Sequence, residues 1–425
     1  MPRQTWSSKL TYILTVAGAT IGFGCTWRFP YLVGQNGGGA YVLVFCIAMI
    51  VLGIPMILVE NVIGRRALRN CVDAFTAPKK DGSRIKPAWK IVGIMGVIGA
   101  FGILAYYMVL GGWVLTYIVN IVSGNFDLSA RITDPAFTQK FYVDHIENSP
   151  LGVGAYTLVF IAINWYILKN GIIEGIEKFV KFLMPALFLC FIAVILTNLT
   201  LEGAKEGVKF YLSVDFAKIT PKLLIDVLGQ VFFALSLGFG VMITLSSFLN
   251  KDEKLMQTAT ITAVVNTLIA VAFSHMPFGN AVAVVFLSIL LIAALTTSIT
   301  IYQVIINFVE ERFSFSTLKA VNLTLGGVFV LGNLPCILSS SVLADVKILG
   351  RSVFDAFDFV SANVFFVLTA LLCCIYVSWV LKKDAIYELT NEGDLSARLA
   401  GVWFLYVKFI LPLIIAVIFG YGIFG

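Results

Sequence analysis

GATIGFGCTWRFPYLVGQNGGG, residues 18–39, is the stretch that decides the fold of this chain. It continues an apolar run, contains Gly18, Gly22 and Gly24, and includes a charge at Arg28. Backbone at membrane depth leaves the helical pattern only where it is buried in protein or lines a watery cavity, because unpaired N–H and C=O groups are costly in hydrocarbon. The stretch therefore predicts an interrupted membrane helix. Glycines that merely allow close helix packing are the alternative.

A second apolar run repeats this pattern. QVFFALSLGFGVMITL, residues 230–245, carries Gly238-Phe239-Gly240 where the first run has Gly22-Phe23-Gly24. Matched glycine-interrupted spans in two halves of a chain indicate a transporter binding site near the middle of the membrane.

The composition places the whole chain in the membrane. Of its 425 residues, 59% are hydrophobic and only 13% are charged, which is typical of an all-α polytopic membrane protein. The net charge of +6 lies mostly in short loops, so we interpret it as a topology signal and expect no nucleic-acid partner. Seven cysteines without a CxxC pair and two histidines make disulfides and zinc sites unexpected. The N-terminus shows no cleavable signal peptide, and no obligatory protein partner is evident.

Apolar runs predict about eleven transmembrane helices in a single domain, residues 1–425. The runs are 10–34, 39–64, 89–123, 151–168, 178–198, 227–249, 258–273, 280–309, 317–343, 352–381 and 400–424. The basic loop after the second run, from Arg65 to Lys90, predicts a cytoplasmic loop and a cytoplasmic N-terminus. Five runs separate the first from the sixth, so the sixth runs in the opposite direction.

This arrangement predicts two inverted repeats, 10–198 and 227–381, followed by an extra helix at 400–424. The seventh run, at about 15 residues, is too short for a full span and predicts a half-depth helix or a strongly thinned corner. His275-Met-Pro-Phe-Gly-Asn280 follows it directly and leaves no room for an outer loop.

Several longer motifs resemble those of one family. They are AGATIGFG, WRFPY and NGGGAY in the first segment, GIPMILVENVIGR in the second, AYYMVLGGW in the third, ALSLGFG in the sixth and LTTSITIYQ in the eighth. The chain resembles the neurotransmitter:sodium symporter family, and within it the short eleven-span bacterial amino-acid transporters related to the bacterial leucine transporter. The resemblance implies a five-plus-five inverted-repeat fold with broken first and sixth helices. It also implies that an outer segment of the family, between the seventh and eighth helices, is missing.

The resemblance implies a substrate site at the two breaks. The amides of Phe23 and Gly24, with the Tyr107 hydroxyl, are expected to hold a carboxylate, as free N–H groups at a helix start can. Gly22 stands where monoamine-transporting relatives carry an aspartate, which favours an amino acid. The remaining substrate contacts are Ile103, Tyr107, Phe233, Ser236, Phe239, Thr297 and Ile301. This largely apolar set predicts a neutral, hydrophobic or aromatic amino acid.

The resemblance also implies one sodium site, made of hard oxygen ligands. Its members are the carbonyls of Gly18, Ile21 and Ala293 and the hydroxyls of Thr296 and Thr297. From the residues alone, the hydroxyls of Thr296 and Thr297 could equally serve hydrogen bonds between helices.

A second sodium site of the family is predicted to be weak or absent. Cys25 replaces the usual asparagine and Ala234 the usual threonine or serine, which leaves Thr20 and Asn266, and a thiol is a poor sodium ligand. Phe45 and Ala270 stand where anion-site groups are expected, so no chloride site is intact. We therefore expect Na⁺ at one site and no other cofactor.

Charged residues inside the spans are interpreted as gates, since such charges are costly and usually functional. The outer pair is Arg28 with Asp358, above an aromatic lid of Tyr107 and Phe233. The expected inner pair is Arg3 with Glu311, beside Trp6, although a solvated surface pair is nearly as good an interpretation there. Glu60 is expected to accept hydrogen bonds from the unwound sixth helix.

The function predicted from the sequence is sodium-coupled import of a neutral amino acid by alternating access, in a bacterial inner membrane. The sequence shows no nucleophile–base pair, metal cluster or phosphate-binding loop, so we do not expect an enzyme. Two alternatives stay open. One is an amino-acid-binding sensor that has lost transport, as the missing outer segment would allow. The other is proton coupling, for which Glu60 is the convincing titratable group.

Overall fold

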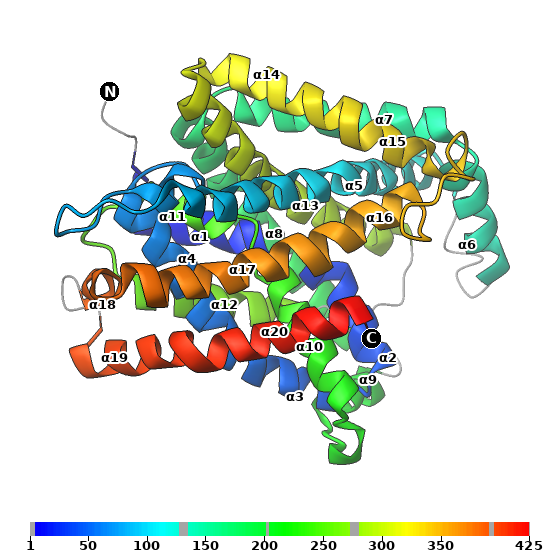
Figure 1. Cartoon of the computed structure of the whole chain (residues 1–425). Helices are drawn as coiled ribbons and strands as arrows, with labels where there is room; N and C mark the ends of the chain where they lie inside the picture. Colours follow the sequence, from blue (N-terminus) through cyan, green and yellow to red (C-terminus); the bar gives the residue numbers. More distant parts are fainter. Residues whose placement is uncertain (1–4, 127–134, 201–203, 273–279, 391–394, 425) are drawn as a thin grey trace.

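The computed structural model describes residues 5–126, 135–200, 204–272, 280–390 and 395–424, and the chain forms a bundle of helices (Figure 1). The first half contains α1 Lys9–Thr20, α2 Phe29–Gln35, α3 Gly39–Ala48, α4 Ile54–Ala67, α5 Lys90–Val122, α6 Pro135–Tyr142, α7 Pro150–Leu168, α8 Lys178–Leu199 and α9 Ala204–Leu212. The second half contains α10 Pro221–Ala234, α11 Val241–Ser246, α12 Leu255–Ala272, α13 Asn280–Phe313, α14 Thr317–Val328, α15 Leu334–Ile337, α16 Val353–Phe359, α17 Val367–Ile375, α18 Lys383–Thr390, α19 Ala397–Leu405 and α20 Leu411–Phe424.

Most of these helices join into continuous apolar spans through short π-helical or 3₁₀ segments. The spans are Gly39–Ala67, Pro87–Val122, Pro150–Leu168, Ile172–Thr197, Ala283–Phe313, Thr317–Ser340, Val353–Leu381 and Ala397–Phe424. Outside the helices, the described residues form only an isolated bridge between Ile348 and Arg351. The predicted all-α membrane fold is confirmed.

The first span is broken where the glycines predicted it. α1 ends at Thr20, Ile21 and Gly22 leave the helical pattern, and the chain continues as the π-helical segment Gly24–Arg28 and α2. The two halves, Lys9–Thr20 and Gly24–Gln35, meet at an angle of 55°.

The sixth span is broken in the same way between α10 and α11. Three residues in the gap have positive φ: Ser236 at 51°, Gly238 at 82° and Gly240 at 76°. A Cβ on Gly238 would lie 2.2 Å from the carbonyl oxygen of Phe366, so both its backbone conformation and its packing require glycine. The Oε1 atom of Glu60 accepts a hydrogen bond of 2.7 Å from the Gly238 N–H, and Glu60 is fully buried.

The connecting segments lie at two opposite ends of the bundle. α6 and α9 are at one end and α18 is at the other (Figure 1). The alternating direction of the predicted runs puts the loops 124–150 and 199–226 on one side of the membrane and the loop 382–399 on the opposite side, and α6, α9 and α18 lie accordingly. We call the end with α6 and α9 the outer end, following the orientation that the basic loops predict.

The seventh helix is longer than the sequence predicted. α12 has 18 residues and begins at Leu255, three residues before the predicted run. Its start is set by packing, because Leu255 and Ala259 are fully buried although Gln257 and Thr258 lower the local hydropathy. At 1.5 Å per residue the helix is about 27 Å long, still short of a hydrocarbon core of about 30 Å. The predicted absence of an outer loop after it falls on residues 273–279, which lie outside the described residues.

Candidate functional site

A small central cavity lies between the two helix breaks. Its described lining residues are Ala19, Thr20, Gly22, Phe23, Gly24, Ile103, Tyr107, Phe233, Ser236, Phe239, Thr297 and Ile301. All ten residues that the sequence predicted as substrate contacts are in this set, and none of the described lining residues carries a charge. The volume of about 20 Å³ holds little more than one water molecule. An amino acid would therefore enter only after the lining side chains move apart.

Hydrogen bonds hold the two breaks against each other. The Ser236 hydroxyl donates to the Ala19 carbonyl at 2.9 Å, and the Gln230 side-chain amide donates to the Gly24 carbonyl at 2.7 Å. The Ser236 hydroxyl thus pairs a carbonyl that the first break frees, and Gln230 adds a second donor to the Gly24 carbonyl, which also accepts the Phe29 N–H. Gln230 was not among the predicted residues, although a buried polar residue inside an apolar run was a usable signal.

The Phe23 amide, predicted to bind a carboxylate, already has a partner. It donates to the Tyr107 hydroxyl at 3.3 Å, and the rings of Phe23 and Tyr107 lie 4.8 Å apart. Gly22 is beside them, where a Cβ would lie 2.6 Å from the Tyr107 hydroxyl and 2.7 Å from the Thr297 hydroxyl. The Tyr107 hydroxyl and the Phe23 amide therefore meet beside Gly22, and a residue larger than glycine does not fit at position 22.

An oxygen-rich cluster adjoins the cavity where α1 meets α13. We call it the Gly18–Thr297 cluster, and its hydrogen bonds and close contacts join Gly18, Ala293, Thr296 and Thr297. Ile21, the fifth predicted ligand, is buried in the helix break three residues after Gly18. The Thr297 hydroxyl donates to the Gly18 carbonyl at 3.0 Å, and the Thr296 hydroxyl donates to the Ala293 carbonyl at 3.1 Å. The close approach of the helices depends on Gly18, whose added Cβ would lie 3.0 Å from the Cβ of Thr296. Carbonyl and hydroxyl oxygens brought together in this way fit a sodium ion.

The residues of the doubtful second sodium site form a different kind of cluster, the Cys25–Asn266 cluster of Thr20, Cys25, Ala234 and Asn266. The side-chain amide nitrogen of Asn266 lies 3.0 Å from the Thr20 carbonyl, 3.0 Å from the Ala234 carbonyl and 3.1 Å from the Cys25 sulfur. The Cys25 thiol also donates to the Thr20 carbonyl, at 3.3 Å. The carbonyls of Thr20 and Ala234 already accept hydrogen bonds, while the buried Oδ1 atom of Asn266 has no partner among the described residues. With a thiol at Cys25 in place of a further oxygen ligand, these residues fit sodium poorly.

A larger cavity of about 390 Å³, the outer cavity, lies above the central one. Its described lining residues are Phe23, Trp27, Arg28, Tyr31, Tyr106, Leu110, Trp113, Phe233, Phe354 and Asp358. Phe23 and Phe233 line both cavities, so their rings form the floor of one and the roof of the other.

The predicted outer ion pair is not formed in this conformation. Arg28 and Asp358 both line the outer cavity, yet the described residues include no ion pair between them. The guanidinium of Arg28 instead lies over the Phe233 ring, 4.8 Å from its centroid, as cations do on aromatic faces. Both charges therefore line the outer cavity without pairing, and the rings of Phe23 and Phe233 lie between this cavity and the central one.

The opposite, inner end is tightly packed. Trp6 is buried, donates from its indole N–H to the Leu245 carbonyl at 3.0 Å, and packs on Tyr12 and Phe248. The Ser7 amide donates to the Glu177 carboxylate at 3.2 Å. The route from the inner end along α1 is therefore closed.

The predicted inner pair of Arg3 and Glu311 can be described only in part. Arg3 lies outside the described residues. The Glu311 carboxylate accepts hydrogen bonds from the backbone and side-chain amides of Asn70, at 2.9 Å and 2.8 Å.

Sequence reasoning missed a buried charge network at the same end. Arg65 is fully buried and forms an ion pair of 2.7 Å with Glu388 of α18. Lys251 lies 3.3 Å from the same carboxylate and donates to the Arg65 carbonyl at 2.7 Å. Burial lowers the pKa of the Lys251 amino group. The network ties α4, the loop after α11 and α18 together, and only a fold that juxtaposes three distant segments could reveal it.

The comparisons with known proteins agree on one family. The model of the sodium:neurotransmitter symporter family matches residues 3–141 and 137–273. A sodium-dependent transporter of Haemophilus influenzae is 54% identical over 98% of this chain and 97% of its own length. The chain belongs to the sodium:neurotransmitter symporter family. It is an integral membrane protein and a sodium-dependent transporter rather than an enzyme.

Two further relatives bear on this symporter's substrate. The crystal structure of MhsT in complex with L-phenylalanine matches 99% of this chain and 100% of the MhsT chain, with a TM-score of 0.84 and 30% identity. The sodium-dependent neutral amino acid transporter B(0)AT2 of Bos taurus is 28% identical over 62% of this chain and 38% of its own.

The alignment with the Haemophilus influenzae protein also bears on the predicted missing segment. It spans 448 positions, which exceeds the 425 residues of this symporter. That relative therefore has residues for which this chain has no counterpart.

Proposed function

We propose that this symporter couples the entry of a neutral, hydrophobic or aromatic amino acid to the entry of sodium, by alternating exposure of the central cavity. The observation that carries the proposal is the meeting of all ten predicted substrate contacts at one cavity, with Thr297 shared between that cavity and the Gly18–Thr297 cluster. The relatives named for L-phenylalanine and for neutral amino acids are consistent with it.

The lining supports an uncharged side chain on the substrate. Ile103, Phe233, Phe239 and Ile301 offer apolar surface and no partner for an ionised group, and burying an unpaired charge would cost several kcal/mol. The carboxylate would replace the Tyr107 hydroxyl as partner of the Phe23 amide, at a helix start that favours negative charge. Because Gly22 has no side-chain carboxylate, the substrate amine would donate hydrogen bonds to backbone carbonyls freed at the break rather than pair with an aspartate.

Sodium bound at the Gly18–Thr297 cluster would supply the charge that orders this site. The hydroxyls of Thr296 and Thr297 donate to carbonyls in this structure, and turning their lone pairs inward would complete an all-oxygen cage. Thr297 would then be fixed at the wall of the central cavity. Sodium and amino acid would therefore favour the same arrangement of α1 and α13, which is the condition for coupling.

We propose a single sodium per transport cycle and no chloride. The amide of Asn266 occupies the carbonyls of the Cys25–Asn266 cluster, so a cation there would first have to displace three hydrogen-bonding contacts. Phe45, at the place expected for an anion-site tyrosine, is fully buried and packs 4.6 Å from the Phe29 ring.

The conformation suggests how access could alternate. The inner end is closed around Trp6, while Phe23 and Phe233 are the described residues that line both the central and the outer cavity. We propose that Phe233 moves first to admit the amino acid, and that Arg28 and Asp358 then approach to close the outer end. The inverted repeats 10–198 and 227–381 would exchange roles as the inner end opens. A bacterial inner membrane with a cytoplasmic N-terminus is the setting we propose.

Uptake into proteoliposomes tests the proposal. Purified protein is reconstituted, a panel of labelled neutral amino acids is supplied, and inward gradients of sodium, potassium or protons are imposed, with equilibrium binding in sodium measured alongside. We expect uptake only with the sodium gradient, for leucine-like or aromatic substrates, with a Hill slope for sodium near one. Sodium-dependent binding without uptake under any gradient would replace the symporter by a sensor. Uptake driven by protons alone would favour the proton-coupled alternative.

A further inference from the structure

α9, Ala204–Leu212, is a short amphipathic helix at the outer end, between α8 and α10 in the chain (Figure 1). The span that contains α8 ends at Thr197, and α10 begins at Pro221, so α9 lies next to the membrane surface rather than in its core. A helix at this depth can meet lipid headgroups and the upper part of the acyl chains. The chemistry of its exposed face therefore decides what it contacts.

One side of α9 is fixed to the turn between α2 and α3. Tyr211 is buried on this side. A Cβ on Gly38 would lie 2.4 Å from the Phe210 carbonyl oxygen, and a Cβ on Gly39 would lie 2.4 Å from the Ser213 carbonyl oxygen. The backbone of the turn and the backbone of α9 are thus in direct contact, and only glycine allows this approach. α9 therefore has a fixed orientation, with one side on the protein and another exposed.

The exposed side of α9 combines apolar and basic residues. Residues three or four apart are neighbours on a helix, so Lys205, Val208, Lys209 and Leu212 form one continuous surface, which we call the α9 face. Val208 is 42% exposed and Leu212 is 67% exposed. Phe216, four residues beyond the helix, is 72% exposed. Large apolar side chains gathered at a surface indicate a contact with a membrane or a partner.

The two lysines of the α9 face are not neutralised by nearby carboxylates. Both are exposed, and neither forms a side-chain hydrogen bond or ion pair with another described residue. Glu206 is two positions before Val208, and residues two apart lie on opposite sides of a helix. Asp215 is engaged locally, because its carboxylate accepts the Ala217 N–H at 3.1 Å. The α9 face is therefore apolar and positively charged.

We propose that the α9 face binds anionic phospholipid headgroups in the leaflet at the outer end. Val208 and Leu212 would lie at the boundary of the acyl chains, and Lys205 and Lys209 would extend along this apolar surface to reach the phosphates. A zwitterionic headgroup brings its own cation beside the phosphate, so a lipid with net negative charge complements two lysines better. Because α9 packs on the turn between α2 and α3, bound lipid would also hold that turn. The inference goes beyond the proposed function, since it concerns lipid rather than amino acid or sodium.

Hydrogen–deuterium exchange followed by mass spectrometry tests this contact on the full-length protein. The protein is placed in nanodiscs of phosphatidylcholine alone or of phosphatidylcholine mixed with phosphatidylglycerol, and exchange is read from peptides that cover α9. We expect the amides of α9 to exchange at least about fivefold more slowly with phosphatidylglycerol, because opening the helix would break the attraction of a lysine to the anionic surface. Lys205→Gln combined with Lys209→Gln should remove this difference. Leu212→Ser should speed exchange in both membranes, since the apolar contact does not depend on headgroup charge.

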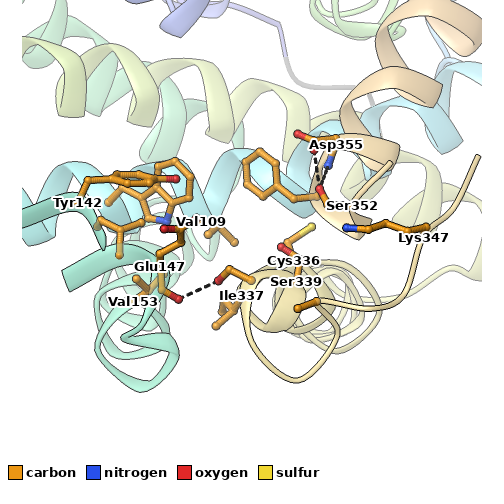
Figure 2. Close-up of a pocket in the computed structure, with 15 residues that line it drawn as sticks. Val109, Tyr142, Glu147, Val153, Cys336, Ile337, Ser339, Lys347, Ser352 and Asp355 are labelled. Atoms are coloured by element: carbon orange, nitrogen blue, oxygen red, sulfur yellow. Dashed lines mark hydrogen bonds between the residues drawn. The ribbon is translucent and has the colours of Figure 1, made fainter. Parts of the chain in front are cut away.

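A lysine elsewhere at the outer end serves as the matched control. Lys347 is also exposed, but its side chain extends from a loop into the space between Ser339 and Ser352 (Figure 2). Lys347→Gln should therefore leave the difference at α9 unchanged. Equal exchange of α9 in the two membranes, or a difference that survives the double lysine variant, would overturn the proposal. The same slowing by inorganic phosphate in phosphatidylcholine nanodiscs would also overturn it, because the ligand would then be a free anion.

Discussion

The Gly18–Thr297 cluster and the Cys25–Asn266 cluster flank the same helix break, yet their chemistry is opposite. In the first, two threonine hydroxyls face backbone carbonyls, and a hydroxyl can turn to offer lone pairs instead of a proton. In the second, the Asn266 amide nitrogen and the Cys25 thiol donate to the carbonyls. The first cluster can take up a cation by rotating two hydroxyls, whereas the second already holds a fixed set of donors.

If this symporter binds a single sodium, as we propose, the difference explains how the fold keeps its shape where the second ion is missing. The Asn266 amide links Thr20 of α1 to Ala234 of α10, as a bound cation between them would. The break stays organised, but the link contributes no dependence on sodium. In the mechanism that we propose, coupling therefore rests on the Gly18–Thr297 cluster alone.

The largest effect is expected from Gly238→Ala, which would disturb both clusters by displacing the second break. The added Cβ would lie 2.2 Å from the Phe366 carbonyl at a φ of 82°, so the folded protein should be largely lost. Folded yield by size-exclusion chromatography measures this. Gly229→Ala is the control, since nothing lies within 4 Å of its added Cβ, and it should express normally. Equal yields would show that the break tolerates a side chain.

Thr297→Val should lower sodium-driven uptake at a fixed sodium concentration on the order of 100-fold, because a nearly isosteric methyl group replaces a proposed ligand. Initial uptake rates across a sodium titration measure the change. Thr300→Val is the matched control, because its buried hydroxyl bonds only within its own helix, to the Thr297 carbonyl at 2.7 Å. If both variants lose the same activity, the effect is one of helix packing and the cluster has no special role.

Cys25→Asn combined with Ala234→Thr should make the Cys25–Asn266 cluster resemble the Gly18–Thr297 cluster, so that it can bind sodium. The two substitutions add side-chain oxygens, and the Asn266 amide could then present its oxygen to a cation. We expect the Hill slope for sodium to rise from near one toward two, measured in the same uptake assay. Cys25→Ser should stay near one, since its hydroxyl would donate to the Thr20 carbonyl as the thiol does. A slope near two in the unaltered protein would remove the contrast between the clusters.

Glu60→Gln is expected to change sodium-driven uptake by no more than about threefold, because a glutamine carbonyl can still accept the Gly238 N–H. Its pH dependence should match that of the unaltered protein. Uptake rates with and without an inward proton gradient measure this. Loss of a proton-driven component in Glu60→Gln would instead assign the coupling to Glu60.

Much of the fold follows from local sequence signals. Gly22 and Gly238 predict breaks because an apolar helix can be interrupted only where the freed carbonyls and amides are buried in protein or reach a cavity. The structure breaks at both places. The start of α12 was misjudged, since Leu255 is fixed by packing that hydropathy does not report. The extent of the spans was otherwise close to the predicted runs.

The sequence predicted which residues belong to the site, but not the geometry of the site. The motifs named the residues that line the central cavity, but its small volume depends on how the rings of Phe233 and Phe239 pack, which no spacing encodes. The open state of Arg28 and Asp358 is likewise a property of one conformation.

The number of sodium ions bound per chain tests the contrast between the clusters most directly. Equilibrium binding of radioactive sodium, measured with saturating amino acid substrate, should give one ion per chain. Thr297→Val should abolish this binding, and Thr300→Val should retain it. Two ions per chain in the unaltered protein, or one ion that survives Thr297→Val, would contradict the assignment of sodium to the Gly18–Thr297 cluster alone.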